Sequence, residues 1–541
     1  MKIIVDVKDA KELYSDRGSL RCLCGTMKAP TVSVSQGTLQ GKICKTTSGR
    51  QYYSFEGIPY AKPPVGPLRF KVKPDNWSGV RDATKPGNRC AQINPFAPQF
   101  VGSEDCLYLN VYTPKLPCKD LETLPVIFYI HGGRLILGFG DYHRPEFLME
   151  KDVIFVTINY RLNVLGFLAL DLPEAPGNVG MKDAVLALKW VNNNIHNFCG
   201  NKHNITIMGE SAGSGVVTCF LVSKLTDGLF HKIIFESGTS LSDLFMEGDH
   251  IEKAQEFVSC LGQDLKDPRE IYEYLMTLPV EQLMDGVCMC ELNKEEINAF
   301  FLPIVEKKIP QIEPFFDDYP FKLFKENKFK KVPVLAGIHS HEGALFLPII
   351  DGAPLLRTDL EFYIPKYLSI PRDSDMAKKM ARDIKNHYFR DKTIGIKTIP
   401  QYVDMLSDTY FLRDLYMHYD ILAKYHKDIY VYRFAYSGNM NTSVMKKLGL
   451  KGASHGDIIA YQFYRKNKVN NMTEDDKKIV NFLSEVWVNF AKNGGQNMGW
   501  LPYQDNERLM LNIDTELTQA VYPERERIEF WKKAMIPRSK M

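Results

Sequence analysis

Short apolar runs alternate with stretches of helical periodicity along the first half of the chain, and further runs follow in the second half. The runs are rich in Val, Ile, Phe and Tyr and have the length of buried strands. They occupy residues 125–130, 152–158, 204–208, 232–236, 332–338 and 428–436. Strands that alternate with helices form parallel sheets covered by helices. The pattern therefore predicts an α/β protein with a mostly parallel central sheet.

Two helices are marked most clearly by their apolar positions. Residues 181–195 place apolar side chains three or four positions apart, and this helix should end near Gly200, just before the 204–208 run. Residues 479–490 repeat the pattern and are followed by Gly494-Gly495, which favours a helix end. Residues 241–330 and 355–425 are more helical and irregular, which fits cap-like insertions around a pocket.

Composition and charge exclude some functions. The 541 residues are 45% hydrophobic and 25% charged, as in ordinary globular proteins. The net charge is only +3, from 68 basic and 65 acidic residues spread along the chain, so neither nucleic acid nor an anionic membrane is expected as the main partner. No apolar stretch approaches the roughly 18 residues of a membrane span.

The amino terminus and the cysteines bear on the compartment. Only residues 3–5 form an apolar run near the start, shorter than the roughly 7–15 residues of a signal peptide, so we expect a cytosolic protein. The eleven cysteines are odd in number and lack the spacing of a zinc site, which favours structural or free thiols over metal ligands. Glycosylation sequons occur at Asn76, Asn204, Asn441 and Asn471.

The sharpest chemical signal is the segment NITIMGESAGSG, residues 204–215. A strand runs into the sequence G-x-S-x-G, and a helical pattern follows. Between a strand and a helix this motif forms a nucleophile elbow, which exposes the serine hydroxyl at the end of the strand. The segment therefore predicts Ser211 as a nucleophile. The helix that follows would point its first amides, including that of Ala212, at a developing negative charge.

A serine nucleophile needs a base and an orienting acid, which follow it in the order acid, then histidine, in elbow enzymes. His455 lies in a glycine-flanked turn and is the candidate base. His387, His418 and His426 lie in helix-like stretches among Lys, Arg and Tyr, and are expected at the surface. The candidate acid is Glu342, at the end of the 332–338 strand. The pattern alone leaves open a solvated glutamate there.

Several long blocks resemble the cholinesterase-like carboxylesterases, which are type-B members of the α/β-hydrolases, and among them most closely the insect α-esterases. The blocks include FEGIPYAKPPVGPLRF (55–70), SEDCLYLNVYTP (103–114), GESAGS (209–214), SHEG (340–343) and GASHGDIIAYQF (452–463). The resemblance implies a single α/β-hydrolase domain over residues 31–541, with helical cap insertions, preceded by an extension at residues 1–30. It also implies Ser211, Glu342 and His455 as the catalytic triad, with no metal or organic cofactor.

The same resemblance assigns supporting roles. The N–H groups of Gly133, Arg134 and Ala212 would form the oxyanion hole, and Leu135 and Glu210 would lie at the substrate pocket. Arg69 and Glu104 match an ion pair of the family. Cys90 and Cys106 match a disulfide of its secreted members, although a reducing compartment would leave them as thiols. Ser237 matches a serine that supports the hydrogen bonds of the acid and base.

Three glycines of the family pattern are replaced here, by Arg134, Asn163 and Cys199. Arg134 stands at the third glycine of the His-Gly-Gly-Gly loop. Two orientations stay open: its side chain turns to the surface, or its guanidinium lies near the reacting centre and crowds bulky acyl groups. In enzymes resembling this one, a polar replacement at this position lets water attack a phosphorylated serine. Organophosphates are therefore expected as inhibitors or slow substrates.

The predicted function is hydrolysis of small to medium apolar esters, of xenobiotic, odorant or lipid-derived origin. Two alternatives are a juvenile-hormone-type esterase and a non-catalytic adhesion or scaffold protein of the same fold. Juvenile-hormone-type esterases have Gln at the position that corresponds to Glu210. Adhesion or scaffold proteins of this fold lack members of the triad, whereas the triad is complete here.

Overall fold

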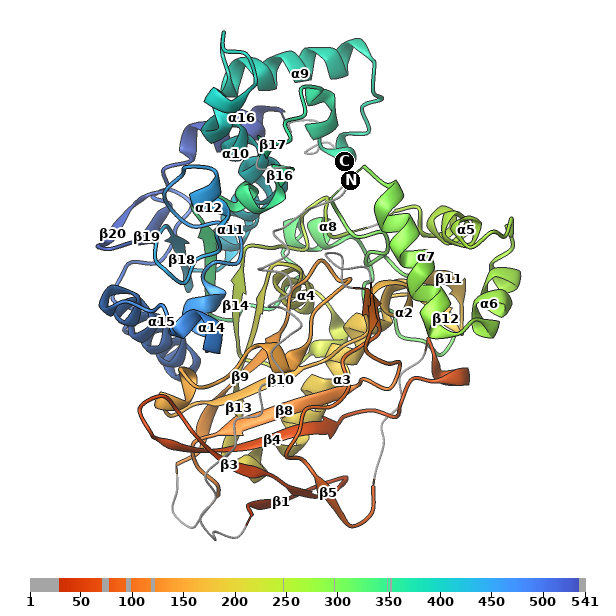
Figure 1. The fold of residues 1–541 in the computed structure, drawn as a ribbon, viewed down its shortest axis with the longest axis vertical. Helices are drawn as coiled ribbons and strands as arrows, with labels where there is room; N and C mark the ends of the chain where they lie inside the picture. Colours follow the sequence, from red (N-terminus) through yellow and green to blue (C-terminus); the bar gives the residue numbers. More distant parts are fainter. Residues whose placement is uncertain are drawn as a thin grey trace.

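The computed structural model describes residues 29–534, except 71–76, 94–98, 118–121, 247, 296, 348 and 351–352. A sheet of eleven strands crosses the molecule (Figure 1). In the order in which they lie side by side, the strands are β20 (Leu517–Val521), β19 (Leu509–Ile513), β18 (Ile429–Phe434), β15 (Val334–His339), β14 (Lys232–Glu236), β13 (Gly200–Glu210), β9 (Leu124–Ile130), β10 (Ile154–Ile158), β8 (Tyr108–Thr113), β4 (Gln51–Pro59) and β3 (Lys42–Lys45).

The strands from β19 to β10 run parallel to their neighbours. The outer strands β20, β8, β4 and β3 pair antiparallel. The prediction of a mostly parallel central sheet is therefore confirmed. Each predicted apolar run corresponds to one of these strands: the bounds of β14 coincide with the prediction, and β13 is longer at both ends.

Smaller sheets join β1 (Thr31–Val34), β2 (Gly37–Gln40) and β5 (Val80–Asp82); β6 (Gln92–Ile93) and β7 (Phe100–Val101); β11 (Ala169–Leu172) and β12 (Ala175–Pro176); and β16 (Ile349–Ile350) and β17 (Ala353–Pro354). The α-helices are α2 (Asn163–Phe167), α3 (Val179–Asn194), α4 (Ala212–Phe220), α5 (His250–Cys260), α6 (Pro268–Thr277), α7 (Val280–Asn293), α8 (Pro320–Lys325), α9 (Asp375–Tyr388), α10 (Ile399–Ser407), α11 (Arg413–Tyr425), α12 (Val444–Lys447), α13 (Ile459–Gln462), α14 (Lys466–Val469), α15 (Glu474–Asn493) and α16 (Arg525–Ala534).

Both faces of the central sheet are covered by helices, and strand β9 shows how. Val126, Phe128 and Ile130 belong to the core that includes α3 and α4. Ile127 and Tyr129 belong to a second core, which includes the apolar face of α15. Successive strand residues point to opposite faces, so a strand buried on both sides is apolar throughout. This explains why the central strands are continuous apolar runs.

The two predicted helices are present as α3 and α15. A short 3₁₀ segment carries α3 to Cys199, and β13 begins at the next residue. Thr473 caps the start of α15 through a reciprocal pair of hydrogen bonds with Asp476. The helix ends before Gly494, whose φ of 66° ends the helical path.

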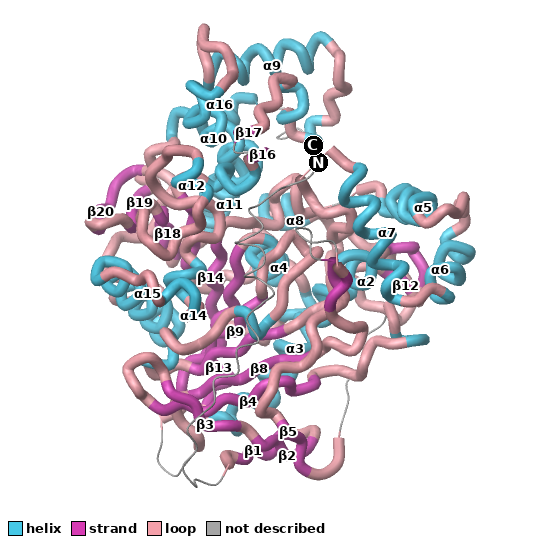
Figure 2. Tube along the Cα trace, viewed as in Figure 1, coloured by secondary structure: helices cyan, strands magenta, loops and turns pink. Residues whose placement is uncertain are grey.

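Two helical regions extend from the carboxyl-end side of the sheet (Figures 1 and 2). Helices α5, α6 and α7 lie to the right in Figure 1, and α9, α10 and α16 lie at the top. The upper group has its own core, in which Trp531 of α16 packs among residues of α9 and α10. Within the described residues, no helix has both the length and the apolar character needed to cross a membrane.

Candidate active site

Ser211 lies at a sharp turn between β13 and α4. Its φ of 58° and ψ of −125° are unfavourable for a residue with a Cβ, and the hydrogen bond from its N–H to the Glu236 carbonyl (2.8 Å) helps to hold it. A Cβ at Gly209 would lie 2.3 Å from the Gly213 carbonyl oxygen, and one at Gly213 would lie 2.1 Å from that of Ile130. Only glycine fits at these two positions, so the G-x-S-x-G sequence produces this turn.

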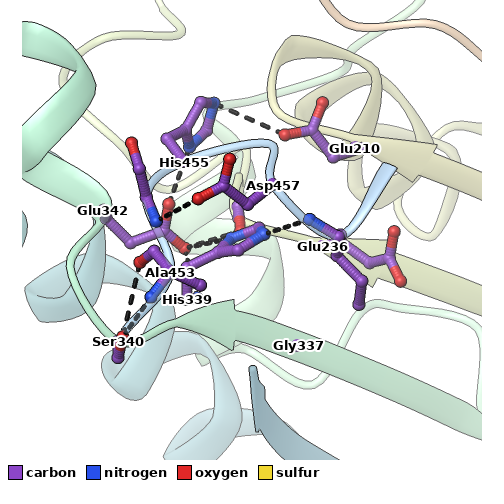
Figure 3. A network of polar contacts seen from close by, with 12 residues as sticks. Glu210, Glu236, Gly337, His339, Ser340, Glu342, Ala453, His455 and Asp457 are labelled. Atoms are coloured by element: carbon purple, nitrogen blue, oxygen red, sulfur yellow. Dashed lines mark hydrogen bonds and ion pairs between the residues drawn. The ribbon is translucent and has the colours of Figure 1, made fainter. Parts of the chain in front are cut away.

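The structure brings Ser211, His455 and Glu342 into one hydrogen-bonded chain. His455 Nε2 is 2.8 Å from Ser211 Oγ, and His455 Nδ1 is 2.7 Å from Glu342 Oε2. Glu342 lies three residues after the end of β15, and His455 lies between α12 and α13 in the segment that follows β18. Because β15 and β18 are neighbouring parallel strands, both segments start from the same edge of the sheet. Figure 3 shows the His455 ring between the carboxylates of Glu342 and Glu210.

Glu342 is fully buried and receives several hydrogen bonds. Its Oε1 accepts from Ser237 Oγ (2.6 Å) and from the main-chain N–H of His339 (2.8 Å), and it lies 3.2 Å from His339 Nδ1. Burial alone would raise the pKa of Glu342. The nearby His339 and His455, with their hydrogen bonds, outweigh burial and hold this pKa well below its usual range. The carboxylate is therefore ionised at neutral pH.

The loop that carries His455 is fixed from both sides. Asp457 accepts hydrogen bonds from the main-chain N–H groups of Ser454 (2.7 Å) and Thr442 (2.6 Å). Ser340 Oγ accepts one from the N–H of Ala453 (2.9 Å), which ties this loop to the end of β15 (Figure 3). The imidazole is thus held in place by its backbone and by its contacts with Glu342.

Ser211 lines an open pocket. The empty space in this pocket is about 580 Å³, a volume that includes the open mouth. Its wall is mainly apolar, with contributions from Leu135, Leu244, Phe245, Ile297, Leu302, Phe346, Phe411 and Leu415. A mainly apolar wall with a few polar groups suits small organic ligands. Leu135 lies at the pocket, where the sequence placed it.

Phe411 forms part of this wall and packs on His455, with 4.6 Å between the two ring centroids. It belongs to a π-helical turn, Asp408–Leu412, between α10 and α11. Buried Asp408 at the start of the turn pairs with Arg527 of α16 (3.1 Å) and accepts a hydrogen bond from Tyr388 (2.6 Å). The last described helix of the chain therefore supports the pocket wall.

The loop after β9 carries the expected oxyanion groups. Gly133 has a φ of 107°, and a Cβ there would lie 2.1 Å from the Leu137 carbonyl oxygen. Arg134 follows with a φ of 58°. Among the described residues, none accepts a hydrogen bond from the main-chain N–H of Gly133, Arg134 or Ala212. These three donors are free to bind a negative oxygen near Ser211.

The Arg134 side chain is held by helix α7 and by the segment that follows it. Its Nη2 donates to Glu291 Oε2 on α7 (3.1 Å) and to the Asn298 carbonyl (2.9 Å). Arg134 also lines the pocket together with Ser211. The guanidinium is thus held against α7 and the segment that follows it, and no hydrogen bond joins it to Ser211.

All three residues that replace family glycines keep a left-handed backbone. The φ values are 58° at Arg134, 48° at Asn163 and 71° at Cys199. This region is unfavourable for side chains other than glycine, although Asn tolerates it better than most. The backbone paths that the glycines would allow are therefore retained in spite of the substitutions.

Glu210 does not line the pocket, which corrects the sequence-based placement. It is the last residue of β13, and its side chain is buried beneath the elbow, with Oε1 3.5 Å from His455 Nε2. Burial raises the pKa of Glu210, an effect that His455 partly offsets. The residue before the serine faces the protein interior because the turn directs only Ser211 toward the opening.

His418 is not at the surface, which also differs from the prediction. Its ring is fully buried, with ring-centroid distances of 5.4 Å to Phe235 and 4.4 Å to Phe324. Its Nδ1 is 2.7 Å from Thr239 Oγ1. Burial lowers the pKa of His418 to about 3, so the ring is a neutral part of the core. His387 and His426 are partly exposed.

The other residues singled out by the sequence also meet their expected neighbours. Arg69 Nε lies 2.6 Å from Glu104 Oε1, in a two-pronged ion pair that is nearly buried. Cys90 and Cys106 form a disulfide. Within the described residues, no group of three or more His, Cys, Asp or Glu side chains is arranged to hold a metal ion.

Sequence reasoning missed three residues of the site. His339 contacts Glu342, Phe411 packs on His455, and Glu291 holds Arg134. His339 directly precedes the SHEG block, three residues before the acid, and this position is a partial local signal. Glu291 and Phe411 carry no comparable signal, since both come from helical insertions far along the chain from their partners.

Comparisons with known proteins agree with this arrangement. The chain is 34% identical to esterase FE4 of Myzus persicae over 93% of this chain and 92% of that protein. It is 33% identical to the juvenile hormone esterase of Heliothis virescens, over 85% and 84%. The crystal structure of juvenile hormone esterase from Manduca sexta, with OTFP covalently attached, has a TM-score of 0.82 at 27% identity and covers 94% of this chain and 99% of that one.

The expectation of a cytosolic protein is wrong. The insect esterases, the juvenile hormone esterases and a fatty acyl-CoA hydrolase precursor of Anas platyrhynchos, to which the chain is similar, are secreted or lumenal proteins. The disulfide between Cys90 and Cys106 agrees with them, because disulfides persist in oxidising compartments. The expectation rested on residues 3–5 and on cysteine parity, and neither determines a compartment.

The similarity covers nearly the whole chain at the level of the family as well. The family model described as "Carboxylesterase family" matches residues 28–531. This range includes the elbow, the acid, the histidine and both helical regions. The chain therefore belongs to the carboxylesterase family and has the α/β-hydrolase fold.

Proposed function

We propose that this carboxylic ester hydrolase acts through Ser211 as nucleophile, His455 as base and Glu342 as acid. The observation that carries the proposal is the unbroken chain from Ser211 Oγ through both nitrogens of His455 to Glu342, with bonds of 2.8 and 2.7 Å. The chain ends at an apolar pocket. A buried carboxylate that orients an imidazole, which in turn contacts a strained serine, is the arrangement that activates a hydroxyl for acyl transfer.

The reaction follows from these positions. His455 Nε2 takes the proton of Ser211 as Oγ attacks the ester carbonyl, and Glu342 stabilises the resulting imidazolium. The N–H groups of Gly133, Arg134 and Ala212 bind the oxyanion. One such donor is worth roughly 3–4 kcal/mol of barrier. His455 then protonates the departing alcohol and leaves an acyl-serine. A water deprotonated by His455 attacks this acyl group, and the carboxylic acid leaves as Ser211 regains its proton.

The substrates are small to medium esters, of xenobiotic, odorant or lipid-derived origin. The mainly apolar wall supports this class, since it excludes water from the acyl or alcohol part. A juvenile-hormone-type esterase is the second candidate, favoured by the similarity to the enzymes of Heliothis virescens and Manduca sexta. The glutamate at position 210 favours the first candidate. A comparison of juvenile hormone with naphthyl esters as substrates separates them.

Organophosphates react at the same serine. Ser211 Oγ attacks phosphorus and expels the leaving group, which leaves a phosphorylated serine. Release of the phosphoryl group requires a water to attack phosphorus. Arg134 lines the pocket together with Ser211. Slow recovery after inhibition is therefore expected in wild type, and recovery should be slower still in Arg134→Gly if the guanidinium assists the water.

Labelling of the pure protein with a fluorophosphonate probe tests the function. Wild type should hydrolyse 1-naphthyl acetate and carry the label on Ser211, whereas Ser211→Ala should lose both. Ser214→Ala is the matched control: its Oγ donates to the Gly238 carbonyl (2.6 Å) and is buried. That variant should keep the label. A folded wild type that neither takes the label nor hydrolyses any ester would favour the non-catalytic alternative.

A further inference from the structure

Two cysteines from different helices meet in the helical region formed by α5, α6 and α7. Cys260 is the last residue of α5, and Cys290 lies in the last turn of α7. The thiol of Cys290 makes a hydrogen-bonding contact with that of Cys260. Both cysteines are free thiols in this structure. Two groups that can be oxidised to a disulfide are therefore already in contact.

The packing of α5 against α7 holds this contact. Gly286 lies one helical turn before Cys290, on the same face of α7. A Cβ at Gly286 would lie 2.8 Å from Leu261 Cδ2 and 3.0 Å from Phe257 Cε2, so the α7 backbone lies directly against the end of α5. The two helices are neighbours at the right of Figure 1. The face of α7 that carries Cys290 therefore packs on the turn of α5 that carries Cys260.

The nearby Cys288 does not share this face. It lies two positions before Cys290, and residues two apart in a helix point in different directions. Cys288 is partly exposed, whereas Cys290 is only 1% exposed and belongs to the core. Helix α7 thus presents Cys290, rather than Cys288, to the end of α5.

The two contacting thiols differ in reactivity. Burial, together with the contact to Cys260, raises the pKa of the Cys290 thiol. The thiolate is the nucleophile in disulfide exchange, so a buried thiol with a raised pKa reacts slowly with an external reagent. Cys260 is partly exposed and packs at the edge of the core. Cys260 is therefore the residue that an oxidant reaches first.

We propose that Cys260 and Cys290 form a second disulfide, which joins α5 to α7, when the protein passes through an oxidising compartment. The disulfide between Cys90 and Cys106 and the secreted or lumenal relatives point to such a compartment. The oxidant is another disulfide, carried by a small molecule or by an oxidoreductase of that compartment. The proposal goes beyond the esterase function and does not depend on it.

The reaction consists of two successive thiol–disulfide exchanges. The thiolate of Cys260 attacks one sulfur of the oxidant, whose S–S bond breaks to release a first thiol. The mixed disulfide that results holds Cys260 Sγ beside Cys290. Cys290 then loses its proton, attacks Cys260 Sγ and displaces the second thiol. Two protein thiols are oxidised to one disulfide, and the oxidant disulfide is reduced to two thiols.

The new bond would restrain a helix that supports the pocket. Glu291 directly follows Cys290 and pairs with Arg134 (3.1 Å), which lines the pocket together with Ser211. The bond also closes the segment that contains α6 into a loop, which lowers the conformational entropy of the unfolded chain. The crosslinked protein should therefore resist thermal unfolding better than the reduced one.

Counting free thiols tests the pairing. Protein secreted from insect cells is unfolded without reductant and alkylated with N-ethylmaleimide, and its intact mass gives the number of free thiols. Cys260→Ala should raise this number by one, because Cys290 loses its partner, and Cys290→Ala should do the same. Cys288→Ala is the matched control on the same helix and should lower the number by one.

Peptide mapping identifies the bond directly. Trypsin places Cys260 in residues 254–266, and Cys288 and Cys290 together in residues 270–294. Wild type should yield these two peptides joined by a bond that reduction breaks. The Cys288→Ala variant should yield the same joined pair, which assigns the bond to Cys290.

Reduction should also affect stability unequally. Dithiothreitol should lower the apparent Tm of wild type by roughly 3 °C more than that of Cys260→Ala, since the Cys90–Cys106 disulfide is common to both. The proposal is overturned if secreted wild type yields the two peptides alkylated and unlinked. A free-thiol number that falls by one in both Cys260→Ala and Cys290→Ala would overturn it equally. If either variant does not fold, the peptide map of wild type still decides the question.

Discussion

The main-chain N–H of Ile458 donates a hydrogen bond of 3.2 Å to Nε2 of His339. A ring nitrogen that accepts a hydrogen bond carries no proton, so the proton of this imidazole is on Nδ1. Nδ1 is 2.8 Å from Ser237 Oγ, which itself donates to Glu342. Because Ile458 lies three residues after His455, one buried ring joins the acid to the loop that carries the base.

This link predicts that His339 is a positioning residue. His339→Ala should lower kcat on the order of tenfold with little change in KM, since one hydrogen bond to a charged group is worth that much. Without the His339 donor, the Glu342 carboxylate stabilises the protonated form of His455 more strongly. The acidic limb of the kcat–pH profile should therefore move to higher pH. His339→Asn, which retains an N–H beside Glu342, should recover part of the rate.

A matched control for this prediction lies two residues further along. His341 contacts Ser340 Oγ (2.9 Å), and its ring makes no hydrogen bond to Glu342. His341→Ala should therefore leave the acidic limb in place. If His339→Ala lowers kcat without moving that limb, the residue has only a structural role.

The two buried glutamates should respond to acid in opposite directions. The pKa of Glu342 is held below its ordinary value of 4.5 by His339 and His455 against the effect of burial. The unfolded chain therefore binds this proton first, so the stability that the carboxylate contributes is present above about pH 4.5 and is lost as the pH falls. The Tm difference between wild type and Glu342→Gln should narrow on going from about pH 6 to about pH 3.

Glu210 provides the contrasting variant. Burial raises its pKa, so here the folded protein binds the proton first and wild type gains stability as the pH falls. The Tm of wild type relative to Glu210→Gln should therefore rise over the same range. Equal pH dependence for both variants, measured by differential scanning calorimetry, would contradict the assigned directions. Glu342→Gln should also lose nearly all esterase activity at neutral pH, since an amide favours the wrong tautomer of His455.

How much of this site the sequence predicts depends on how far apart the contacting residues lie along the chain. The strands and Ser211 follow from local patterns, because a buried parallel strand is apolar throughout and the elbow needs its two glycines. The partners of Arg134 do not, since Glu291 and Asn298 lie 157 and 164 residues further along the chain. The inward direction of Glu210 and the burial of His418 likewise depend on packing between elements that are distant in the sequence. The periodicity of one segment carries no information about such packing.

Cys199 tests the cost of a side chain at a left-handed position. Its φ is 71°, and its thiol donates to the Glu122 carbonyl (3.6 Å). Cys199→Gly should be more stable than Cys199→Ala by about 1 kcal/mol, because only alanine retains a Cβ in this conformation. The alanine variant serves as the control for loss of the thiol. Equal unfolding midpoints in urea for the two variants would show that the position is unstrained.

Secretory expression should modify the sequons unequally. Asn471 is exposed. The amide of Asn441 instead donates to the Tyr436 carbonyl (2.9 Å) and accepts from the Tyr461 hydroxyl (2.6 Å), so no glycan fits there. Protein secreted from insect cells should carry an N-glycan at Asn471 and none at Asn441, as measured by peptide mass spectrometry after enzymatic deglycosylation. A glycan at Asn441 would contradict the structure of that loop.

The support that α16 gives to the pocket also sets the time at which the enzyme is completed. Synthesis proceeds from the amino terminus, so the nucleophile elbow emerges long before Arg527, which pairs with Asp408 below Phe411. A nascent chain that does not yet include Arg527 already holds Ser211 and even His455, but the aromatic wall beside them lacks its final anchor. The pocket wall beside Ser211 therefore becomes complete only when α16 has been synthesised and has packed against Asp408.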